Sequence, residues 1–234
     1  MTTITKERQI RTYLIGLISS PDLDRTEKLP SENQIAEKFA TSRHTVRKVY
    51  ESLEELGMVY SQQGIGRFPI KERPEINLAL TGTSFSQKME EQNIPLQTLN
   101  IGVRKLKDRE LEKFWDLGLQ GQVYEISRLR ILHNIPAAIH RSYLSSENFP
   151  NIEEEGQDIL SIHAYYRSKG LKDFKHSSST LSISWPSLRD IEVLSCGSLV
   201  PLLVLEGKLY DQEGRLIEII KTKYRSDLFK YSLE

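Results

Sequence analysis

The chain has 234 residues, and its 32 basic and 32 acidic side chains give a formal net charge of zero. This length suffices for one large domain or two small ones, each with a hydrophobic core of its own. Zero net charge excludes a generally basic nucleic-acid-coating protein, so any binding to nucleic acid has to come from a local basic patch. The single cysteine, Cys196, excludes an internal disulfide and indicates a reducing compartment.

Several other classes of protein are disfavoured by the sequence. The first residues are polar and charged, so we expect no secretory signal. The longest apolar run, Leu199 to Leu205, contains Pro201 and is too short to span a bilayer. The five histidines lack the spacing of a metal site, and neither a G-x-S-x-G nor a phosphate-loop motif occurs. We therefore expect a cytoplasmic protein without metal or cofactor, and not an enzyme.

Three amphipathic helices are predicted in the first part of the chain. Apolar residues recur at helical spacing within residues 5–19 and predict a first helix. Ser31 begins a capping box that opens a second helix at Glu32. Ser42 then opens a third helix, whose apolar stripe runs from Val46 to Leu56.

The third helix carries its basic side chains near its N-terminal end. Arg43 and Arg47 are four residues apart and therefore share one face of the helix. Backbone N–H groups and the helix dipole favour phosphate at this end, and the acidic Glu51, Glu54 and Glu55 follow only later. The layout is typical of a recognition helix that enters the DNA major groove. The alternative, a solvated face of mixed charge, is disfavoured by the neighbouring elements.

A two-stranded ribbon is predicted directly after the third helix. Residues 59–61 and 68–70 flank a turn that contains Gly64 and Gly66, followed by Arg67. A glycine-rich tip with an arginine suits contact with a phosphate or with a narrow minor groove. A plain hairpin turn is the alternative, and the preceding helices favour a wing.

Between Leu29 and Phe68, the segments LPSENQIAEKF, SRHTVRKVYESLEELGMV and GIGRF resemble the winged helix-turn-helix of the GntR family of bacterial transcription regulators. The resemblance implies that the start of the third helix and the ribbon tip contact operator DNA. One departure is Asn33, where the family often carries a basic residue that touches the DNA backbone. Loss of that charge is expected to weaken DNA binding, unless Lys38 or His44 replaces it. The predicted DNA-binding residues are Ser31, Asn33, Ser42, Arg43, His44, Thr45, Arg47, Lys48, Gly64, Gly66 and Arg67.

The rest of the chain is predicted to form a second domain. The charged, proline-containing stretch at 71–75 opens a linker, which we place at 71–78, between domains of residues 1–70 and 79–234. Helices on one side of an antiparallel sheet are expected, which makes this an α+β domain. The expected helices are 84–91, 108–117, 159–169 and 187–194, and the expected strands are 123–132, 137–144, 180–185, 202–210 and 215–226.

Side chains that share a strand face indicate a ligand site in this domain. Arg128 and Arg130 are two apart, so their Cα atoms lie about 6.6 Å apart on one face, and paired guanidinium groups commonly hold phosphate or carboxylate. Glu218 and Tyr224 also share a face and offer an acceptor and a phenol to hydroxyls or an amine. The N–H groups of the helix that opens at residues 84–86 suit the same anion. Each feature alone is more often surface or core, and their convergence favours a site.

Within residues 79–234, the segments TSFSQKMEEQNI, EISRLRIL, AAIHRSYL and GRLIEIIKTKYRSD resemble the UTRA domain, the effector-binding module of the HutC-like branch of the GntR family. The resemblance implies a chorismate-lyase-like α+β fold, a homodimer formed largely through this domain, and a pocket that holds phosphorylated sugars in some members. His140 departs from the glutamate common in related segments. It either contacts polar groups of the ligand or is a hydrogen-bonded histidine without a ligand role. The predicted effector-binding residues are Ser84, Phe85, Ser86, Arg128, Arg130, His140, Ser161, Glu218 and Tyr224.

We therefore predict a homodimeric DNA-binding transcription regulator, a repressor in the favoured interpretation. Its expected partners are double-stranded operator DNA and a small anionic effector, with a phosphorylated sugar favoured and no membrane. The effector acts only through its different affinities for two arrangements of the dimer. Two other classes compete: an enzyme of lyase-like fold fused to a DNA-binding domain, and a general nucleoid protein. The absence of catalytic motifs argues against the first, and zero net charge argues against the second.

Overall fold

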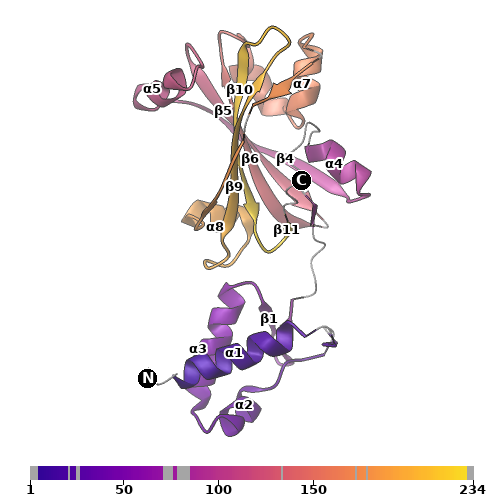
Figure 1. The fold of residues 1–234 in the computed structure, drawn as a ribbon, viewed down its shortest axis with the longest axis vertical. Helices are drawn as coiled ribbons and strands as arrows, with labels where there is room; N and C mark the ends of the chain where they lie inside the picture. The colour runs from indigo at the N-terminus through magenta and orange to yellow at the C-terminus, as the bar shows by residue number, and fades with distance from the viewer. Residues whose placement is uncertain are drawn as a thin grey trace. The chain divides into compact units, whose positions relative to one another are not determined.

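The computed structural model describes residues 5–20, 22–24, 27–70, 76–77, 85–132, 134–171, 173–177 and 179–230. These residues form two compact units (Figure 1). The first unit contains the described residues within 1–75, 185–192 and 196–200, and the second contains those within 76–184, 193–195 and 201–234.

Residues 6–55 fold into the helices α1 (Lys6–Ile18), α2 (Glu32–Lys38) and α3 (Arg43–Glu55). The predicted capping box is confirmed: the Ser31 hydroxyl accepts the N–H of Gln34 at 3.3 Å, and the Gln34 side-chain oxygen accepts the N–H of Ser31 at 2.7 Å. The Ser42 hydroxyl accepts the N–H of Thr45 at 3.1 Å in the same way. Local side-chain chemistry therefore fixes where α2 and α3 begin.

The apolar stripes of these three helices pack against one another. Tyr50 lies among them and donates its phenol to the carbonyl oxygen of Pro30 at 2.5 Å, so its polar tip has a partner. Gly57, with φ of +68°, takes the left-handed conformation that ends α3. The fully buried residues of this core are Ile10, Leu14, Val46, Tyr50 and Leu53.

The predicted ribbon is confirmed as an antiparallel pair of strands, β1 (Val59–Gln62) and β2 (Gly66–Pro69). Tyr60 faces Phe68 across the pair, and their ring centroids lie 5.5 Å apart. Gly64 and Gly66 have φ values of +75° and +149°, which residues with a Cβ rarely adopt. The ribbon tip therefore needs both glycines.

The second unit is built on an antiparallel sheet of order β4-β5-β6-β10-β9-β7, with β8 also paired to β9. Two further short segments, β3 (Ile76–Asn77) and β11 (Phe229–Lys230), pair in parallel. Strand β4 was not anticipated, because a bulge between Asn100 and Gly102 interrupts its alternation. The strands of the sheet are β4 (Leu96–Lys105), β5 (Val123–Leu132), β6 (Ile135–Ser145), β7 (Lys175–His176), β8 (Thr180–Ser184), β9 (Leu202–Tyr210) and β10 (Leu216–Arg225).

Helices connect these strands, and Figure 1 labels α4, α5, α7 and α8 among them. They are α4 (Phe85–Glu91), α5 (Asp108–Asp116), α6 (Ile152–Glu155) with the 3-10 helix η1 (Gly156–Asp158), α7 (Ile162–Ser168) and α8 (Leu188–Leu194). Helix α7 begins three residues later than predicted, because the Ser161 hydroxyl caps it by accepting the N–H of Ala164 at 3.4 Å.

Strand register divides the sheet side chains between two faces. We call the face that carries Arg128, His140, Ser142 and Tyr224 the pocket face, and the face that carries Arg141, Tyr143, Ile219 and Lys221 the outer face. Helices α4 and α7 pack on the pocket face. Helix α5 packs on the outer face, where the ring of Phe114 lies 4.5 Å from that of Tyr143. The expectation that the helices lie on one side of the sheet is therefore wrong for α5.

A second bulge, between Leu216 and Glu218, changes the alternation of β10. Leu216 packs with the hydrophobic cluster on the outer face. Glu218 follows only two residues later, and its paired residue on β9 is Leu209, next to the partner of Leu216. Because the bulge adds one unpaired residue, Glu218 reaches the pocket face.

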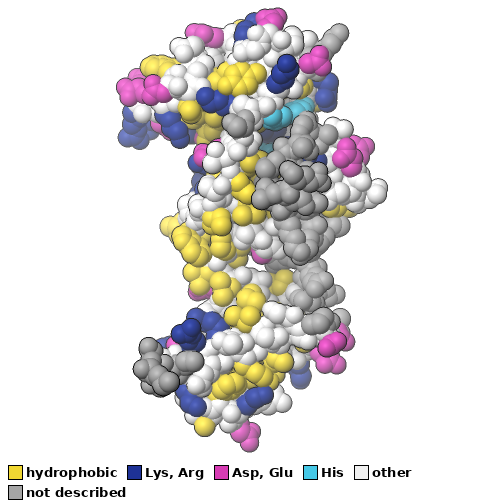
Figure 2. Space-filling view, viewed as in Figure 1, with side chains coloured by type: hydrophobic (Ala, Val, Ile, Leu, Met, Phe, Trp, Pro, Cys, Tyr) yellow, Lys and Arg dark blue, Asp and Glu magenta, His cyan; other side chains and the backbone are white. Residues whose placement is uncertain are grey.

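Charged side chains of both signs are scattered over the face drawn in Figure 2. On the side drawn in Figure 2, Lys and Arg are interspersed with Asp and Glu, consistent with a net charge of zero. Among the helices that the structure describes, none is long and apolar enough to cross a membrane. The same residues contain no group of three or more His, Cys, Asp and Glu side chains that could hold a metal ion.

Leu14→Ala should destabilise the three-helix core by about 2–5 kcal/mol, because it removes a fully buried side chain and leaves a cavity. Urea unfolding followed by far-ultraviolet circular dichroism would measure the change. Arg11→Ala, on the exposed side of the same helix, should change stability by less than about 0.5 kcal/mol. Equal effects of the two substitutions would contradict the packing described above.

Candidate functional site

The first turns of α3 present their cationic side chains to solvent. Arg43 has 62% of its side chain exposed, and Arg47 has 51% exposed. His44 and Lys48 are also exposed, whereas Thr45 is half-buried. The predicted recognition surface is therefore accessible within its own unit.

The carboxylate of Glu32 lies at the centre of a group of arginines. Its two oxygens accept from Nε and Nη2 of Arg47, both at 3.1 Å. One oxygen also accepts from Nη1 of Arg67 at 3.0 Å, and the other lies 3.7 Å from Nη2 of Arg43. The hydrogen bond from Arg47 holds the pKa of Glu32 below its usual value, so this carboxylate is ionised at neutral pH.

Arg67 of the ribbon is directed toward the helices. Its Nε donates to Glu54 at 3.0 Å, its Nη1 donates to Glu32, and its guanidinium carbon lies 4.7 Å from the centre of the Tyr50 ring. With 21% of its side chain exposed, Arg67 is far less accessible than Arg47. It therefore fastens the ribbon to α2 and α3, and its contact with a minor groove stays a prediction.

The remaining residues predicted to bind DNA lie around this group. Ser31 and Asn33 are exposed at the start of α2. Of the two candidates to replace the charge missing at Asn33, Lys38 has its amine 3.9 Å from the centre of the Tyr13 ring. His44 is exposed on the first turn of α3, and replacement of the missing charge by either residue stays a prediction. Ser42 is engaged as a helix cap.

The two arginines of β5 are buried side by side on the pocket face. Arg128 is 2% exposed and Arg130 is 4% exposed. Arg128 donates to the Ser142 hydroxyl, and Arg130 donates to the Thr98 hydroxyl and to the Leu160 carbonyl. Three of their nitrogens, Nε and Nη1 of Arg128 and Nε of Arg130, have no hydrogen-bond partner among the described residues. Buried donors without partners are costly, and a bound anion would satisfy them.

Three aromatic rings lie beside these guanidinium groups. The His140 ring is 5.0 Å from Phe85 and 5.6 Å from Tyr224, and the guanidinium carbon of Arg130 is 5.6 Å from the centre of the Phe85 ring. Burial lowers the pKa of His140 well below its usual value, and the charges of Arg130 and Arg128 lower it further. Its Nε2 has no partner among the described residues, which disfavours the alternative of a hydrogen-bonded histidine without a ligand role.

An acidic and a phenolic group complete the buried cluster. Glu218 is 1% exposed, and burial raises its pKa while Arg128 lowers it. Burial and then the charge of Glu218 raise the pKa of Tyr166. Tyr166 and Ser142 lie close enough to the Glu218 carboxylate to lower its pKa by hydrogen bonding, but neither Oε2 of Glu218 nor the hydroxyl of Tyr166 makes a hydrogen bond of full geometry within the described part of the chain. The site therefore offers cationic donors on one side and an acceptor with a phenol on the other.

Two of the predicted serines lie at the edge of this cluster. Ser86 of α4 and Ser161 line a depression of about 470 Å³ together with Thr98, the residue that accepts a hydrogen bond from Arg130. The third predicted serine, Ser84, lies outside the described residues. The structure thus gathers the predicted residues of α4, β5, β6, α7 and β10 on one face of the sheet.

Sequence reasoning missed three polar residues of this cluster. Ser142 is two residues from His140 and could have been found from strand alternation. Tyr166 lies one helical turn after Ile162, inside a helix that was predicted. Thr98 lies on β4, the strand that the sequence did not reveal.

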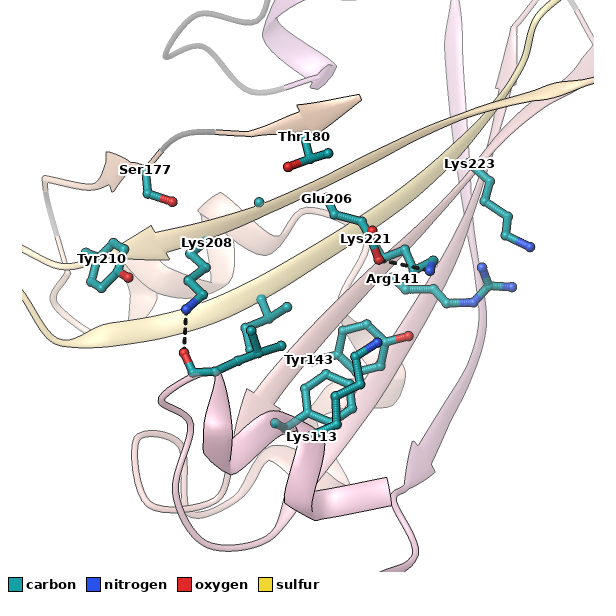
Figure 3. A pocket seen from close by; sticks show the side chains of 14 residues that line it. Lys113, Arg141, Tyr143, Ser177, Thr180, Glu206, Lys208, Tyr210, Lys221 and Lys223 are labelled. Carbon is teal, nitrogen blue, oxygen red and sulfur yellow. Dashed lines mark hydrogen bonds and ion pairs between the residues drawn. The ribbon is translucent and has the colours of Figure 1, made fainter. Parts of the chain in front are cut away.

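A larger depression, of about 640 Å³, lies on the outer face between α5 and the sheet (Figure 3). Four lysines line it, and the described contacts give partners for two of them. Lys221 pairs with Glu206 at 2.9 Å, and Lys208 donates to the Leu117 carbonyl at 2.6 Å. The outer depression therefore lacks the buried unpaired groups that distinguish the pocket face.

Comparisons with known proteins agree with this two-part organisation. Residues 92–230 match the model of the UTRA domain, and residues 6–68 match that of the bacterial regulatory proteins of the gntR family. The chain is 27% identical over 225 residues to the HTH-type transcriptional repressor NagR of Bacillus subtilis (strain 168), covering 95% of this chain and 91% of NagR. It is 24% identical over 230 residues to the HTH-type transcriptional repressor PhnF of Mycolicibacterium smegmatis, covering 98% and 92% of the two chains.

The fold is also similar to that of a solved structure. The crystal structure of PhnF from Mycobacterium smegmatis superimposes with a TM-score of 0.61 at 22% sequence identity, covering 96% of this chain and 99% of that chain. Its effector domain alone gives a TM-score of 0.60 and covers 67% of this chain. These likenesses show that the fold is shared.

Acidification should destabilise the second unit. Burial lowers the pKa of His163 to about 4, so this imidazole is neutral when folded but takes up a proton in the unfolded chain below its ordinary pKa of 6.5. Stability is therefore lost as the pH falls from about 6.5 toward 4. Melting temperatures at pH 7 and pH 5 should differ less for His163→Gln than for the unchanged protein. An identical pH dependence in both proteins would contradict the burial of this histidine.

Proposed function

Since this chain belongs to the GntR family of bacterial transcription regulators, in the HutC-like branch that carries a UTRA domain, we propose that a small anionic metabolite on the pocket face controls its binding to operator DNA. The observation that carries this proposal is the set of buried polar atoms without described partners around Arg128 and Glu218. A ligand that satisfies them gains hydrogen bonds inside a site where water is largely excluded.

The charge pattern of the cluster favours a ligand with two different ends. Arg128 and Arg130 suit an anionic group such as a phosphate or carboxylate. Glu218 carries an open acceptor, which suits a hydroxyl or amine on the same ligand. A phosphorylated sugar combines both ends in one small molecule and is therefore the favoured class. A neutral His140 adds a further polar group that can either donate or accept.

The pocket face supports this proposal better than the outer depression does. On the outer face, Lys221 has Glu206 and Lys208 has a backbone carbonyl as partners. An anion binding there would have to compete with those contacts in a largely open depression. On the pocket face, an anion would meet guanidinium groups that are already desolvated, so each hydrogen bond is stronger.

We propose that two copies of the chain act together as a repressor. The second domain, residues 79–234, would hold the effector and the dimer contact, and residues 1–70 would hold the DNA-binding surface, joined by a linker at 71–78. A two-fold operator requires two recognition helices at a spacing that matches the groove repeat. An effector that binds one arrangement of the dimer more tightly would change this spacing and thereby the affinity for DNA.

A lyase-like enzyme fused to a DNA-binding domain is the second candidate, because the resembled domain shares its fold with a lyase. The pocket face offers no described metal-binding group, and its histidine is held neutral beside two arginines. We propose that the protein releases its ligand unchanged. Incubation with bound sugar phosphates followed by mass spectrometry distinguishes the two, since an enzyme would leave product.

Arg43→Ala and Arg47→Ala should each weaken binding to operator DNA by about 1–3 kcal/mol, because each removes an exposed cation from the start of α3. The operator can be obtained by selection from a random duplex pool with the unchanged protein. Gel-shift titrations would then measure the affinities. Arg109→Ala, which removes an exposed arginine of α5, is the matched control and should leave the affinity unchanged. Wild-type affinity in either α3 variant would contradict the assignment of α3 as the recognition helix.

Arg128→Ala should abolish the response to effector while leaving DNA binding intact. Thermal-shift screening against sugar phosphates and small carboxylates identifies ligands, because binding to the folded state raises the melting temperature. A compound that stabilises the unchanged protein should give no shift with Arg128→Ala. Lys221→Ala removes a cation from the opposite face of the sheet and should keep the full shift. Ligand-induced release from DNA that persists in Arg128→Ala would exclude the pocket face as the effector site.

A further inference from the structure

We propose that Glu32 is a positioning residue for operator reading: it holds one edge of the Arg47 guanidinium so that the other edge is presented to a guanine. This inference rests on the proposed role of α3 as the recognition helix. Glu32 lies on α2 and is absent from the residues predicted to bind DNA, since an acidic side chain would repel phosphate.

The geometry of the Glu32–Arg47 pair determines which N–H donors of Arg47 remain available to DNA. Glu32 accepts from Nε and Nη2, which form the side edge of the guanidinium. The end edge, formed by Nη1 and the second hydrogen of Nη2, has no contact in the described structure. That end edge is a fork of two parallel donors, which matches the O6 and N7 acceptors of guanine in the major groove. Half of the Arg47 side chain is exposed, so the fork is accessible.

Glu32 is itself held in place by contacts on its other side. Its side chain is 11% exposed, and one of its oxygens accepts from Arg67. Arg67 is fixed in turn by Glu54 and by the ring of Tyr50. Because these contacts come from α3 and β2, the carboxylate cannot simply follow Arg47 when the arginine moves. Arg47 is therefore oriented before DNA arrives, which reduces the ordering cost of binding.

The three arginines around Glu32 differ in how they contact it, and we assign them different roles accordingly. Arg43 is 62% exposed, and its Nη2 lies 3.7 Å from the Glu32 carboxylate, which is beyond hydrogen-bonding distance. Its guanidinium group therefore remains available to a phosphate. Arg47 is held by one edge and reads a base. Arg67 donates to the carboxylates of Glu54 and Glu32 and thereby holds the ribbon against α2 and α3. One acidic residue thus distinguishes a base-reading arginine from a phosphate-binding one.

A second explanation gives the opposite prediction. If Glu32 merely competed with DNA for the arginines, its removal would free positive charge and raise the affinity for every duplex. If Glu32 positions Arg47, its removal lowers the affinity for the operator alone, because nonspecific binding needs charge but no orientation. The ratio of specific to nonspecific affinity therefore separates the two explanations.

The experiment compares Glu32→Gln with Glu37→Gln in the full chain. Both substitutions remove one negative charge from α2, but Glu37 is exposed and contacts no arginine among the described interactions. The probes are the duplex selected from a random pool and an unrelated duplex of equal length. Glu32→Gln should lose about tenfold or more on the selected duplex, and its affinity for the unrelated duplex should stay equal or rise. Glu37→Gln should keep the wild-type ratio.

A second measurement tests the base contact directly and does not need the Glu32→Gln variant. Guanines of the selected duplex are replaced one at a time by 7-deazaguanine, which lacks the N7 acceptor. One guanine in each half-site should cost binding in the unchanged protein, and that cost should vanish in Arg47→Ala but persist in Arg43→Ala. A higher operator affinity in Glu32→Gln, a wild-type ratio in Glu32→Gln, or no guanine sensitive to N7 would each overturn the proposal. Failure of the selection to yield any preferred sequence would instead contradict the proposed function.

Discussion

Two buried guanidinium groups, two residues apart on the same strand, impose the main constraint on the second unit. Like charges this close repel each other, and burial lowers the pKa of Arg130 to about 9 together with the charge of Arg128. The surrounding hydroxyls of Ser142 and Thr98 satisfy only part of their donors. Stability alone does not explain such an arrangement, because apolar side chains of similar size would pack there without this cost. The anion site proposed above would explain it, and the other polar groups on the pocket face fit the same proposal.

The arginines of the first unit are held in place by a carboxylate. Its arginines are needed at an exposed surface, where long side chains normally sample many rotamers. Glu32 restricts two of them by accepting from Arg47 and Arg67 at once. On the pocket face, several donors of the buried arginines thus have no described partner, whereas Arg47 and Arg67 in the first unit are held by an anionic partner. Among the described residues, arginine is buried with unpartnered donors on the pocket face of the second unit, and more exposed but paired with a carboxylate in the first.

Short-range signals predicted most of the first unit. Ser31 and Ser42 marked the helix starts because a cap is a contact between neighbouring residues. In the second unit, alternation predicted that Arg128 and Arg130 share a face, but it missed β4, whose bulge at Gly102 breaks the pattern. The association of Arg130 with Thr98, and that of Glu32 with three arginines, could not be predicted from spacing. Both depend on tertiary contacts between residues that are distant in the sequence.

The bulge before Glu218 separates the length of the adjoining turn from the orientation of the side chains on the pocket face. In a regular hairpin, insertion of one residue would turn every following side chain to the opposite side of the sheet. Here the extra residue is already accommodated between Leu216 and Glu218, next to the turn at Asp211–Gly214. A change of one residue in that turn can therefore be absorbed at the bulge, so that the Glu218 side chain stays on the pocket face. Variation in turn length among relatives would then be a poor guide to what each of them senses.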